Sequence, residues 1–224
     1  MSMRICTVLA AMALLTAGAR EASAQMFNFD KDPVGQPPRG FSCGLTGGGK
    51  PGVWVVKADD STPSGSHVLA QIDPDATGYR FPVCVVDTVS AVNVDVSVKF
   101  KPISGAGDQA AGLVWRYMDV NNYYIVRANA NENDVTLYKV ERGKRISLAP
   151  KGTPPSTYGK SAPVSSGRWG TLRVIANGTL FQIYYNGRPL YDVEDATFTG
   201  AGKVGVWTKA DSVTYFDDLR ILIK

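Results

Sequence analysis

The clearest alternation of apolar and polar residues in the chain covers residues 92–100, V-N-V-D-V-S-V-K-F. Successive side chains of a strand point to opposite faces, so a period of two predicts a half-buried β-strand. The valines and the closing phenylalanine are expected to face a core. The residues between them are expected to face water: Asn93, Asp95, Ser97 and Lys99.

Short apolar runs separated by turn-forming residues continue along the chain. They cover residues 26–30, 41–46, 53–57, 68–72, 81–86, 113–118, 123–129, 135–140, 145–148, 204–209 and 213–223. Residues 150–166 are rich in Pro, Ser and Gly and predict a long loop, which is usually functional or mobile. Even spacing of short strands, with no amphipathic helix between them, predicts an all-β, two-sheet antiparallel jelly-roll sandwich.

Residues 169–192 hold two Asn-Gly pairs, Asn177-Gly178 and Asn186-Gly187, between runs of β-branched and aromatic residues. Asn-Gly supplies the two residues with positive φ that a type I′ turn needs, so each pair indicates a hairpin. Together the two turns predict a three-strand antiparallel meander.

Two-residue loops also fix the register of this meander. They place Leu172 opposite Ile183 and Ile183 opposite Leu190. The predicted apolar face then consists of Leu172, Val174, Phe181, Ile183 and Leu190. The predicted polar face carries Arg173, Gln182 and Tyr191 in one row, with Thr171 and Tyr184 beside it. Such a face is either a solvated outer surface or a binding surface, and the pattern alone fits both.

The first 24 residues have the pattern of a signal peptide. Arg4 lies in a short basic region, residues 8–17 are apolar, and Ala22-Ser23-Ala24 is a small-residue cleavage site. The apolar run is too short to span a bilayer. We therefore expect residues 25–224 to form a single β-sandwich domain that is periplasmic or secreted and does not span the membrane.

Charge and cysteine content narrow the function further. The chain has 24 Lys and Arg against 20 Asp and Glu, a net charge of +4 that is too small and too evenly spread to indicate nucleic-acid binding. Of its three cysteines, Cys6 lies in the leader. In an oxidising compartment Cys43 and Cys84 are expected to form a disulfide; the alternative is two buried thiols too far apart to join.

Two further runs carry a resemblance. They are G-L-V-W-R-Y-M-D-V-N-N-Y-Y-I-V-R-A-N at 112–129 and G-K-V-G-V-W-T-K-A-D-S-V-T-Y-F-D-D-L-R-I at 202–221. With the meander, they resemble the 3-keto-disaccharide hydrolase-like group and, more broadly, the concanavalin A-like lectin/glucanase superfamily with its laminin-G domains. The resemblance implies a jelly roll with one concave sheet that often handles carbohydrate. Such folds host lectins, hydrolases and interaction modules, so function has to be argued from the site.

Sugar sites combine an aromatic platform with planar hydrogen-bonding groups. Arg127 and Asn129 share one predicted strand face, and Trp207 and Lys209 share another. The candidate ligand-binding residues are Arg127, Asn129, Arg173, Gln182, Tyr184, Tyr191, Trp207 and Lys209. The alternative is that the tryptophan packs in a core while the charges face water. Trp115 and Trp169 are expected to be core residues.

Asp217 and Asp218, near the last strand, are candidate calcium ligands by the same resemblance, with Ca²⁺ as the only cofactor considered. Calcium takes six to eight oxygen ligands, many of them backbone carbonyls. The alternative is that one of the two carboxylates pairs with Arg220 or caps a turn.

Catalysis has little support in the sequence. A glucanase of this superfamily would carry an E-x-D-x-E strand that aims its carboxylates at one face, and no such run occurs. The only suppliers of a general acid or base that we can name are Asp95, Asp134, Asp192 and His67, and no spacing singles one out.

The leading hypothesis is an exported carbohydrate-binding or interaction domain. The alternatives are a glycoside hydrolase of the 3-keto-disaccharide hydrolase type and a structural envelope protein.

Overall fold

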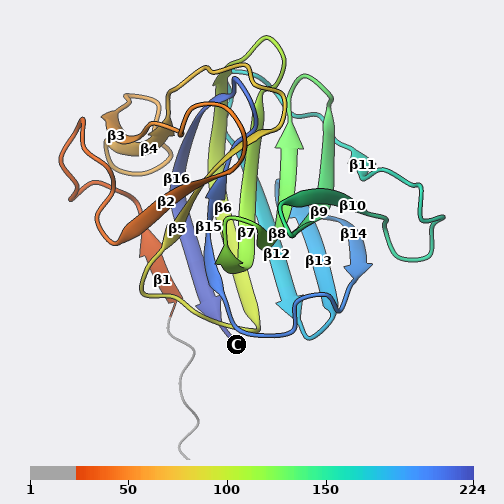
Figure 1. Cartoon of the computed structure of the whole chain (residues 1–224). Coiled ribbons are helices and arrows are strands. Elements are labelled where there is room, and N and C mark those ends of the chain that lie inside the picture. Colours follow the sequence, from red (N-terminus) through yellow and green to blue (C-terminus); the bar gives the residue numbers. More distant parts are fainter. Residues whose placement is uncertain (1–23) are drawn as a thin grey trace, which may run out of the picture.

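The computed structural model describes residues 24–224. Within them the chain forms two antiparallel eight-stranded sheets packed face to face (Figure 1). This is the predicted two-sheet sandwich. Apart from Ala24, the predicted leader lies outside the described residues. Among residues 24–224 there is no helix with the length and apolar character needed to cross a membrane.

Sheet A contains the meander and both ends of the described chain. Its strand order is β14 (Arg188–Glu194), β13 (Leu180–Tyr185), β12 (Gly170–Asn177), β6 (Val94–Ser104), β16 (Val213–Ile223), β4 (His67–Gln71) and β3 (Trp54–Ala58). The first described strand, β1 (Ala24–Phe27), also pairs with β16, so the start of the described chain lies beside its C-terminus (Figure 1).

Sheet B contains most of the middle of the chain. Its strand order is β10 (Lys144–Leu148), β9 (Asp134–Glu141), β8 (Asn122–Asn129), β7 (Ala110–Asp119), β15 (Lys203–Trp207), β5 (Arg80–Val86) and β2 (Phe41–Gly47). Within the predicted long loop, β11 (Lys160–Ser161) adds two residues to the edge of β9.

The alternation over residues 92–100 is confirmed from residue 94 onward. Val94, Val96 and Val98 are buried between the sheets, whereas Val92 precedes β6 and is exposed. Among the intervening polar residues, Asp95 is also buried, because Arg173 covers its carboxylate from the neighbouring strand. Strand patterning identified the buried face but not this ion pair.

Aromatic side chains form the centre of the inter-sheet core. Trp115 of β7 stacks on Tyr124 of β8 with ring centroids 5.5 Å apart, and Phe181 of β13 approaches the same tryptophan edge-on at 5.3 Å. Full burial of each such side chain stabilises the fold by about 1.5–3 kcal/mol. Trp169, also predicted in the core, lies instead at the surface of sheet A, where its indole N–H donates to the carbonyl of Ser61.

The first turn of the meander is shifted from its predicted position. Gly178 and Thr179 occupy the turn, so Asn177 pairs with Leu180 and Val174 with Ile183. Gly178 has φ +56° and Asn177 does not have positive φ, which is typical of a type II′ turn with glycine in its first central position. The shift moves the pairing by two residues, and side chains alternate with the same period, so the predicted faces of β12 and β13 are preserved.

The third strand of the meander differs more. The second turn, Asn186-Gly187, forms as predicted, but the register then shifts between Ile183 and Tyr184. As a result Ile183 pairs with Tyr191 rather than with Leu190. The extra residue in β14 reverses the side to which Tyr191 points. Tyr191 therefore packs against the inter-sheet core, and the predicted polar row of Arg173, Gln182 and Tyr191 does not exist.

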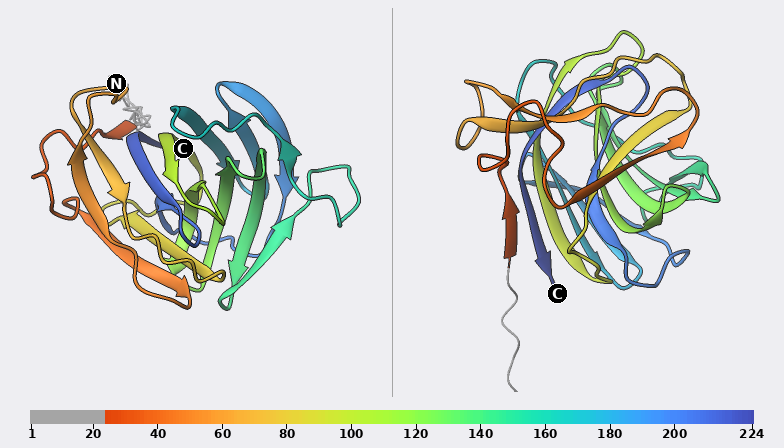
Figure 2. Two further views of the ribbon diagram at one scale, coloured as in Figure 1. Left: turned by 90° about the horizontal axis from the view of Figure 1, so that it is seen from above. Right: turned by 60° about the vertical axis from the view of Figure 1, so that its left-hand side comes forward.

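Sheet B is strongly curved, and the left view of Figure 2 shows its strands following an arc. Tyr79 directly precedes β5, and Gly143 lies in the turn between β9 and β10, four strands away in the sheet order. The phenol of Tyr79 nevertheless donates to the carbonyl of Gly143 at 3.0 Å. The outer face of sheet B is thus the inside of a curl, and apolar side chains fill it.

Cys43 and Cys84 form a disulfide between the paired strands β2 and β5, with their Cα atoms 4.0 Å apart. The bond attaches an edge strand to the sheet. Thr46, on the same edge strand, donates or accepts a hydrogen bond at 2.9 Å with the hydroxyl of Tyr123 on β8. The edge strand therefore belongs to the wall of the curl.

Candidate functional site

The outer face of sheet B holds a second hydrophobic cluster, separate from the inter-sheet core. Its largest members are Phe81, Tyr123, Tyr138 and Trp207. Gly112 makes room for it: a Cβ at that position would lie 2.3 Å from Ile125 Cδ1 and 3.2 Å from the Trp207 ring. Sheet B is therefore apolar on both faces, and the centre of its outer face is buried rather than solvated.

Trp207 forms part of the floor of this face. Its ring stacks on Phe81 with centroids 5.2 Å apart, and its indole N–H donates to the Tyr123 hydroxyl at 3.2 Å. The residue is 0% exposed. A sugar cannot stack on it directly in this structure, which agrees with the alternative that the tryptophan packs in a core.

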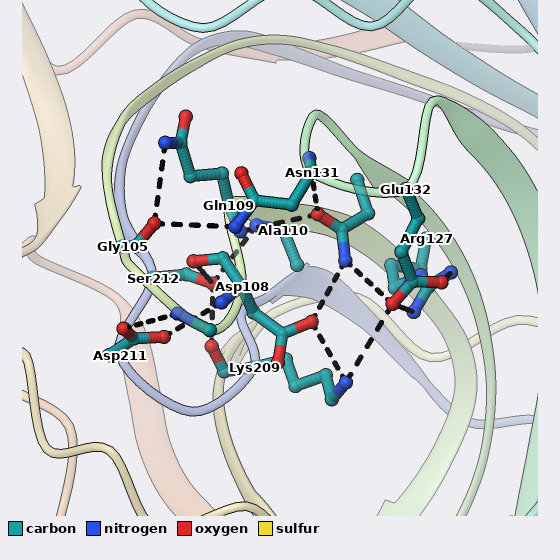
Figure 3. Close-up of polar contacts among 12 residues, drawn as sticks. Gly105, Asp108, Gln109, Ala110, Arg127, Asn131, Glu132, Lys209, Asp211 and Ser212 are labelled. Atoms are coloured by element: carbon teal, nitrogen blue, oxygen red, sulfur yellow. Dashed lines mark hydrogen bonds and ion pairs between the residues drawn. The ribbon is translucent and has the colours of Figure 1, made fainter.

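Three other predicted residues, Arg127, Asn129 and Lys209, lie together beside that floor. Arg127 forms a two-pronged ion pair with Glu132 and also donates to both carboxylate oxygens of Asp134. Figure 3 shows Lys209 reaching toward Asp108 and Glu132, with Arg127 on the far side of Glu132. We call this set the charged network: Asp108, Arg127, Asn129, Glu132, Asp134 and Lys209.

Asn129 links the two halves of the charged network. Its amide nitrogen donates to Asp108 at 2.8 Å and to Glu132 at 3.0 Å. Asp108 is held in turn by its loop, because the Asp211 carboxylate accepts the backbone N–H groups of Ala106, Gly107 and Asp108. The charged network is thus held both by side chains of the strands and by the loop that carries Asp108, so its geometry is fixed.

Electrostatics favour the charged forms of Arg127 and Glu132. Burial acts to lower the pKa of the Arg127 guanidinium, but Tyr138, Asp134 and Glu132 outweigh burial and hold the pKa above its ordinary value. Burial acts to raise the pKa of Glu132, but the hydrogen bond and charge of Arg127 outweigh it and lower that pKa. Glu132 is therefore an anion near neutral pH, and its side chain is 38% exposed.

Arg145, from β10, lies over the aromatic floor. Its guanidinium carbon is 4.5 Å from the centroid of Tyr138, 4.6 Å from that of Phe81 and 5.9 Å from that of Trp207. The guanidinium makes no hydrogen bond or ion pair with any of residues 24–224, and its Nη1 is buried without a partner. Nε of Arg127 is likewise buried and unpartnered.

Two half-exposed tyrosines pack against the floor rings that this guanidinium covers. On one side Tyr79, 45% exposed, packs against Phe81 at 4.6 Å and accepts the backbone N–H of Arg145. On the other side Tyr158, 49% exposed, lies edge-on to Tyr138 and hydrogen-bonds its hydroxyl. We call this set the Arg145 cup: the floor Phe81, Tyr138 and Trp207, the guanidinium of Arg145, and the rim residues Tyr79 and Tyr158.

The backbone of the long loop sets the position of Tyr158. The next residue, Gly159, has φ +51°, and a Cβ there would lie 2.2 Å from Thr136 Oγ1 and 2.6 Å from the carbonyl oxygen of Val135. Only glycine allows the loop to approach β9 so closely. The segment predicted to be functional or mobile thus supplies one wall of the cup.

The other predicted ligand-binding residues lie elsewhere. Arg173, Gln182 and Tyr184 are on the outer face of sheet A, on the opposite side of the sandwich from the Arg145 cup. There Arg173 is paired with Asp95 at 2.6 Å and lies 5.2 Å from the Tyr184 ring. The eight predicted residues therefore do not form one groove.

The four catalytic candidates are not brought together either. Asp95 lies on the outer face of sheet A and Asp134 on that of sheet B, and each is held by an arginine. His67 begins β4, where its Nδ1 is buried without a partner, and Asp192 lies in β14 at the sheet edge. No pair of these groups has the geometry of an acid and a base acting on one bond.

Asp217 and Asp218 lie in an irregular stretch of β16. Asp218 pairs with Lys99 at 2.8 Å and accepts the hydroxyl of Ser64, so the basic partner is Lys99 rather than Arg220. Asp217 is fully buried, and burial raises its pKa to about 7. Across residues 24–224, no three His, Cys, Asp or Glu side chains are placed together to hold a metal ion.

Sequence reasoning missed most of the Arg145 cup. Patterning places Tyr79 in a turn and Arg145 in a strand without a role for either, and nothing in a linear pattern shows that a sheet will curl far enough to join them. Tyr158 had one signal, its place in a long loop rich in Pro, Ser and Gly.

Searches by sequence find no matching family and no matching curated protein. Similarity to solved structures is clear. The carbohydrate-binding module CBM66 from Bacillus subtilis aligns with a TM-score of 0.61 at 20% identity, over 81% of this chain and 94% of that one. The cellulose-induced protein Cip1 aligns with a TM-score of 0.57 at 12% identity, over 81% and 90%. A Bacillus subtilis protein of unknown function with a galectin-like fold gives 0.52 at 13%, over 81% and 88%. At these identities the similarity establishes the fold alone, a two-sheet antiparallel jelly-roll sandwich.

Proposed function

We propose that this protein is an exported carbohydrate-binding domain and that it holds a saccharide in the Arg145 cup. The observation that carries the proposal is the guanidinium of Arg145, which lies over an aromatic floor flanked by two half-exposed tyrosines and whose buried Nη1 has no acceptor among residues 24–224. A guanidinium presents five N–H donors in a rigid fork, and buried donors are normally paired.

The chemistry of the cup suits a sugar. Ring oxygens and hydroxyls accept hydrogen bonds from a guanidinium, while the C–H face of a pyranose packs on aromatic rings such as those of Tyr79 and Tyr158. The exposed carboxylate of Glu132 offers an acceptor for hydroxyl protons at the side of Arg127. Apolar floor, aromatic rim and a few fixed polar groups are the usual composition of a small-ligand site.

The fold adds support without settling the ligand. One structural neighbour is described as a carbohydrate-binding module and another as a cellulose-induced protein. Binding is favoured over hydrolysis because the carboxylates nearest the cup, Glu132 and Asp134, are both bound by Arg127, which also lowers the pKa of Glu132. Hydrolysis of the 3-keto-disaccharide type stays a prediction from the sequence resemblance, as does export.

A glycan array probed with residues 25–224 tests the proposal directly, followed by titration calorimetry on the best ligand. Arg145→Ala and Tyr158→Ala are expected to weaken binding at least tenfold. Two matched controls, Arg168→Ala and Tyr184→Ala, remove the same residue types from an exposed loop and from the outer face of sheet A. They are expected to bind normally.

Two outcomes would overturn the proposal. One is an array on which no glycan binds. The other is a ligand whose affinity survives Arg145→Ala but is lost in Tyr184→Ala, which would move the site to sheet A. Circular dichroism of each variant separates a lost site from a lost fold.

A further inference from the structure

We infer that the saccharide held in the Arg145 cup carries a carboxylate, as uronic acid residues do, and that Arg145 binds this group with its guanidinium fork. The inference rests on the proposed function and adds the chemical class of the ligand. Its basis is the set of charges around the cup and the way the buried arginines Arg80 and Arg116 are satisfied.

Every carboxylate of the charged network already has cationic or amide donors. Asp134 and Glu132 are both bound by Arg127, at 2.8 Å and 2.7 Å. Asp108 is bound by Lys209 at 2.8 Å and by Asn129. None of these carboxylates forms a hydrogen bond or ion pair with Arg145, although its charge contributes to the lowered pKa of Glu132, and Nη1 of Arg145 is buried without a partner among residues 24–224.

Arg145 is partly buried, and the fully buried arginines show how this chain satisfies a guanidinium that serves only the structure. Arg80 donates to the carbonyls of Lys50 and Ala210 and to the carboxylate of Asp73. Arg116 donates to the carbonyls of Val92, Phe198 and Gly178. Arg145 has no such acceptors among residues 24–224, although the turn at Gly143 is close in sequence.

The surroundings of Arg145 favour an anion that arrives from outside. The rings of Phe81, Tyr138 and Trp207 exclude water from one side of the guanidinium. A charge-assisted hydrogen bond is stronger where water is excluded, and a planar carboxylate fits the fork with two parallel bonds. Nε of Arg127 is also unpartnered on this face, but it is fully buried under Tyr138 and Tyr158, so Arg145 is the guanidinium that an incoming anion can reach.

The geometry favours a carboxylate over a sulfate ester. A carboxylate is flat and attached directly to the sugar ring, so one ring can stack against the rim while its acid reaches Arg145. A sulfate ester is tetrahedral and stands further from the ring. Both are anions, so the test includes both.

Calorimetry on residues 25–224 with pairs of matched oligosaccharides is the test. Each pair is a uronate oligomer, of galacturonate, glucuronate or mannuronate, and the same oligomer after reduction of its carboxyls to neutral alcohols. For at least one pair the acid is expected to bind at least tenfold more tightly than its reduced form. Added salt is expected to narrow that difference, since screening weakens charge-assisted contacts.

Variants then assign the effect to one side chain. Arg145→Gln removes the charge and is expected to abolish the preference for the acid. Arg145→Lys keeps the charge without the fork and is expected to retain part of the preference for the acid. Arg168→Gln removes the same formal charge from an exposed loop and is expected to retain all of it.

The outcomes separate this inference from the proposed function. If the acid and reduced forms bind equally in every pair, the carboxylate inference is wrong and the cup is a site for neutral sugars. A sulfated neutral oligosaccharide that binds more tightly than every uronate would also overturn it. If no glycan of any kind binds, the proposed function itself fails.

Discussion

The backbone N–H of Arg145 donates to the phenol oxygen of Tyr79 at 2.6 Å, although the two residues are 66 positions apart in the chain. The same phenol donates to the carbonyl of Gly143 at 3.0 Å. One side chain thus ties the segment before β5 to the start of β10 and closes the curl of sheet B. It also fixes the backbone that carries Arg145.

Tyr79→Phe removes both hydrogen bonds and keeps the ring that packs on Phe81. Each net hydrogen bond is worth about 1 kcal/mol, so we expect the free energy of unfolding to fall by about 1–2 kcal/mol. Affinity at the Arg145 cup should fall as well, because the β10 backbone loses its anchor. Urea denaturation and calorimetry measure the two effects; a variant with unchanged stability and unchanged affinity would show that the tie has no role.

The faces of the meander predict opposite results for two alanine variants. Ile183 is buried between the sheets, so Ile183→Ala is expected to cost about 2–5 kcal/mol through lost burial and a cavity. Arg173 lies on the outer face of sheet A in a half-exposed ion pair with Asp95. Arg173→Ala is expected to cost about 1 kcal/mol or less.

Chemical denaturation of both variants gives the comparison, and Gln182→Ala on the same outer face is a control expected to be near neutral. A ranking in which Arg173→Ala is the more damaging change would mean that β12 presents its other face to the core.

Asp217 should make stability depend on pH in an unusual direction. Burial raises the pKa of its carboxyl from 3.8 to about 7. At pH values between these two pKa values the folded protein therefore binds a proton that the unfolded chain does not. The stabilisation from this proton is complete below about pH 4 and is lost as pH rises to about 7. We expect the free energy of unfolding to fall across this window, against the usual trend of carboxylates paired with cations.

Asp217→Asn removes the titrating group and keeps an oxygen that can accept the N–H of Asp218. Its stability should vary less with pH, and at pH 8 it should exceed that of the parent by about 1 kcal/mol or more, since each factor of ten in proton affinity is worth about 1.4 kcal/mol. Urea midpoints at pH 5 and pH 8 measure the difference. Equal pH dependence in the two proteins would assign the carboxyl an ordinary pKa.

The same proteins test the calcium site expected from the resemblance. If Asp217 and Asp218 hold calcium, millimolar Ca²⁺ should raise the unfolding midpoint of the parent at pH 8 and leave Asp217→Asn unchanged. If Ca²⁺ leaves the unfolding midpoint of both proteins unchanged, Asp217 and Asp218 do not form a calcium site.

Reduction of the Cys43–Cys84 disulfide is expected to destabilise the fold by roughly 4 kcal/mol. The reason is that the unfolded chain regains the conformational entropy that a crosslink across 41 residues removes. Because β2 also carries Thr46, which bonds Tyr123 beneath the cup, ligand affinity should fall in parallel. Paired melts with and without reductant, together with Cys43→Ser/Cys84→Ser, give the measurement. Identical melts would mean that β2 is held without the disulfide.

Local patterning was enough to predict the sandwich and the inner faces of its strands. Burial of alternate residues in β6, β12 and β13 follows directly from their period of two. These faces are as predicted although the turn lies one residue later, because the pairing shifts by two and an even shift leaves every side chain on the same side.

Features that depend on long-range geometry were not predictable in this way. The bulge in β14 reverses Tyr191, and Pro189 beside it indicates either an edge strand or a bulge without saying which. The curl of sheet B arises from packing across the whole sheet. In the curled sheet Trp207 is fully buried, so it does not offer a sugar the aromatic stacking surface that was predicted. Arg145 became a candidate only once its missing partners could be seen.

The closure through Tyr79 and Arg145 has a consequence for how the protein reaches its native state. Contacts between residues so far apart in sequence form late and slow the folding of β proteins, since chain entropy is lost before they form. The Arg145 cup can exist only after that slow step. A ligand bound there would therefore report the last stage of folding. Refolding monitored by ligand binding should be slower than refolding monitored by the backbone signal of the strands.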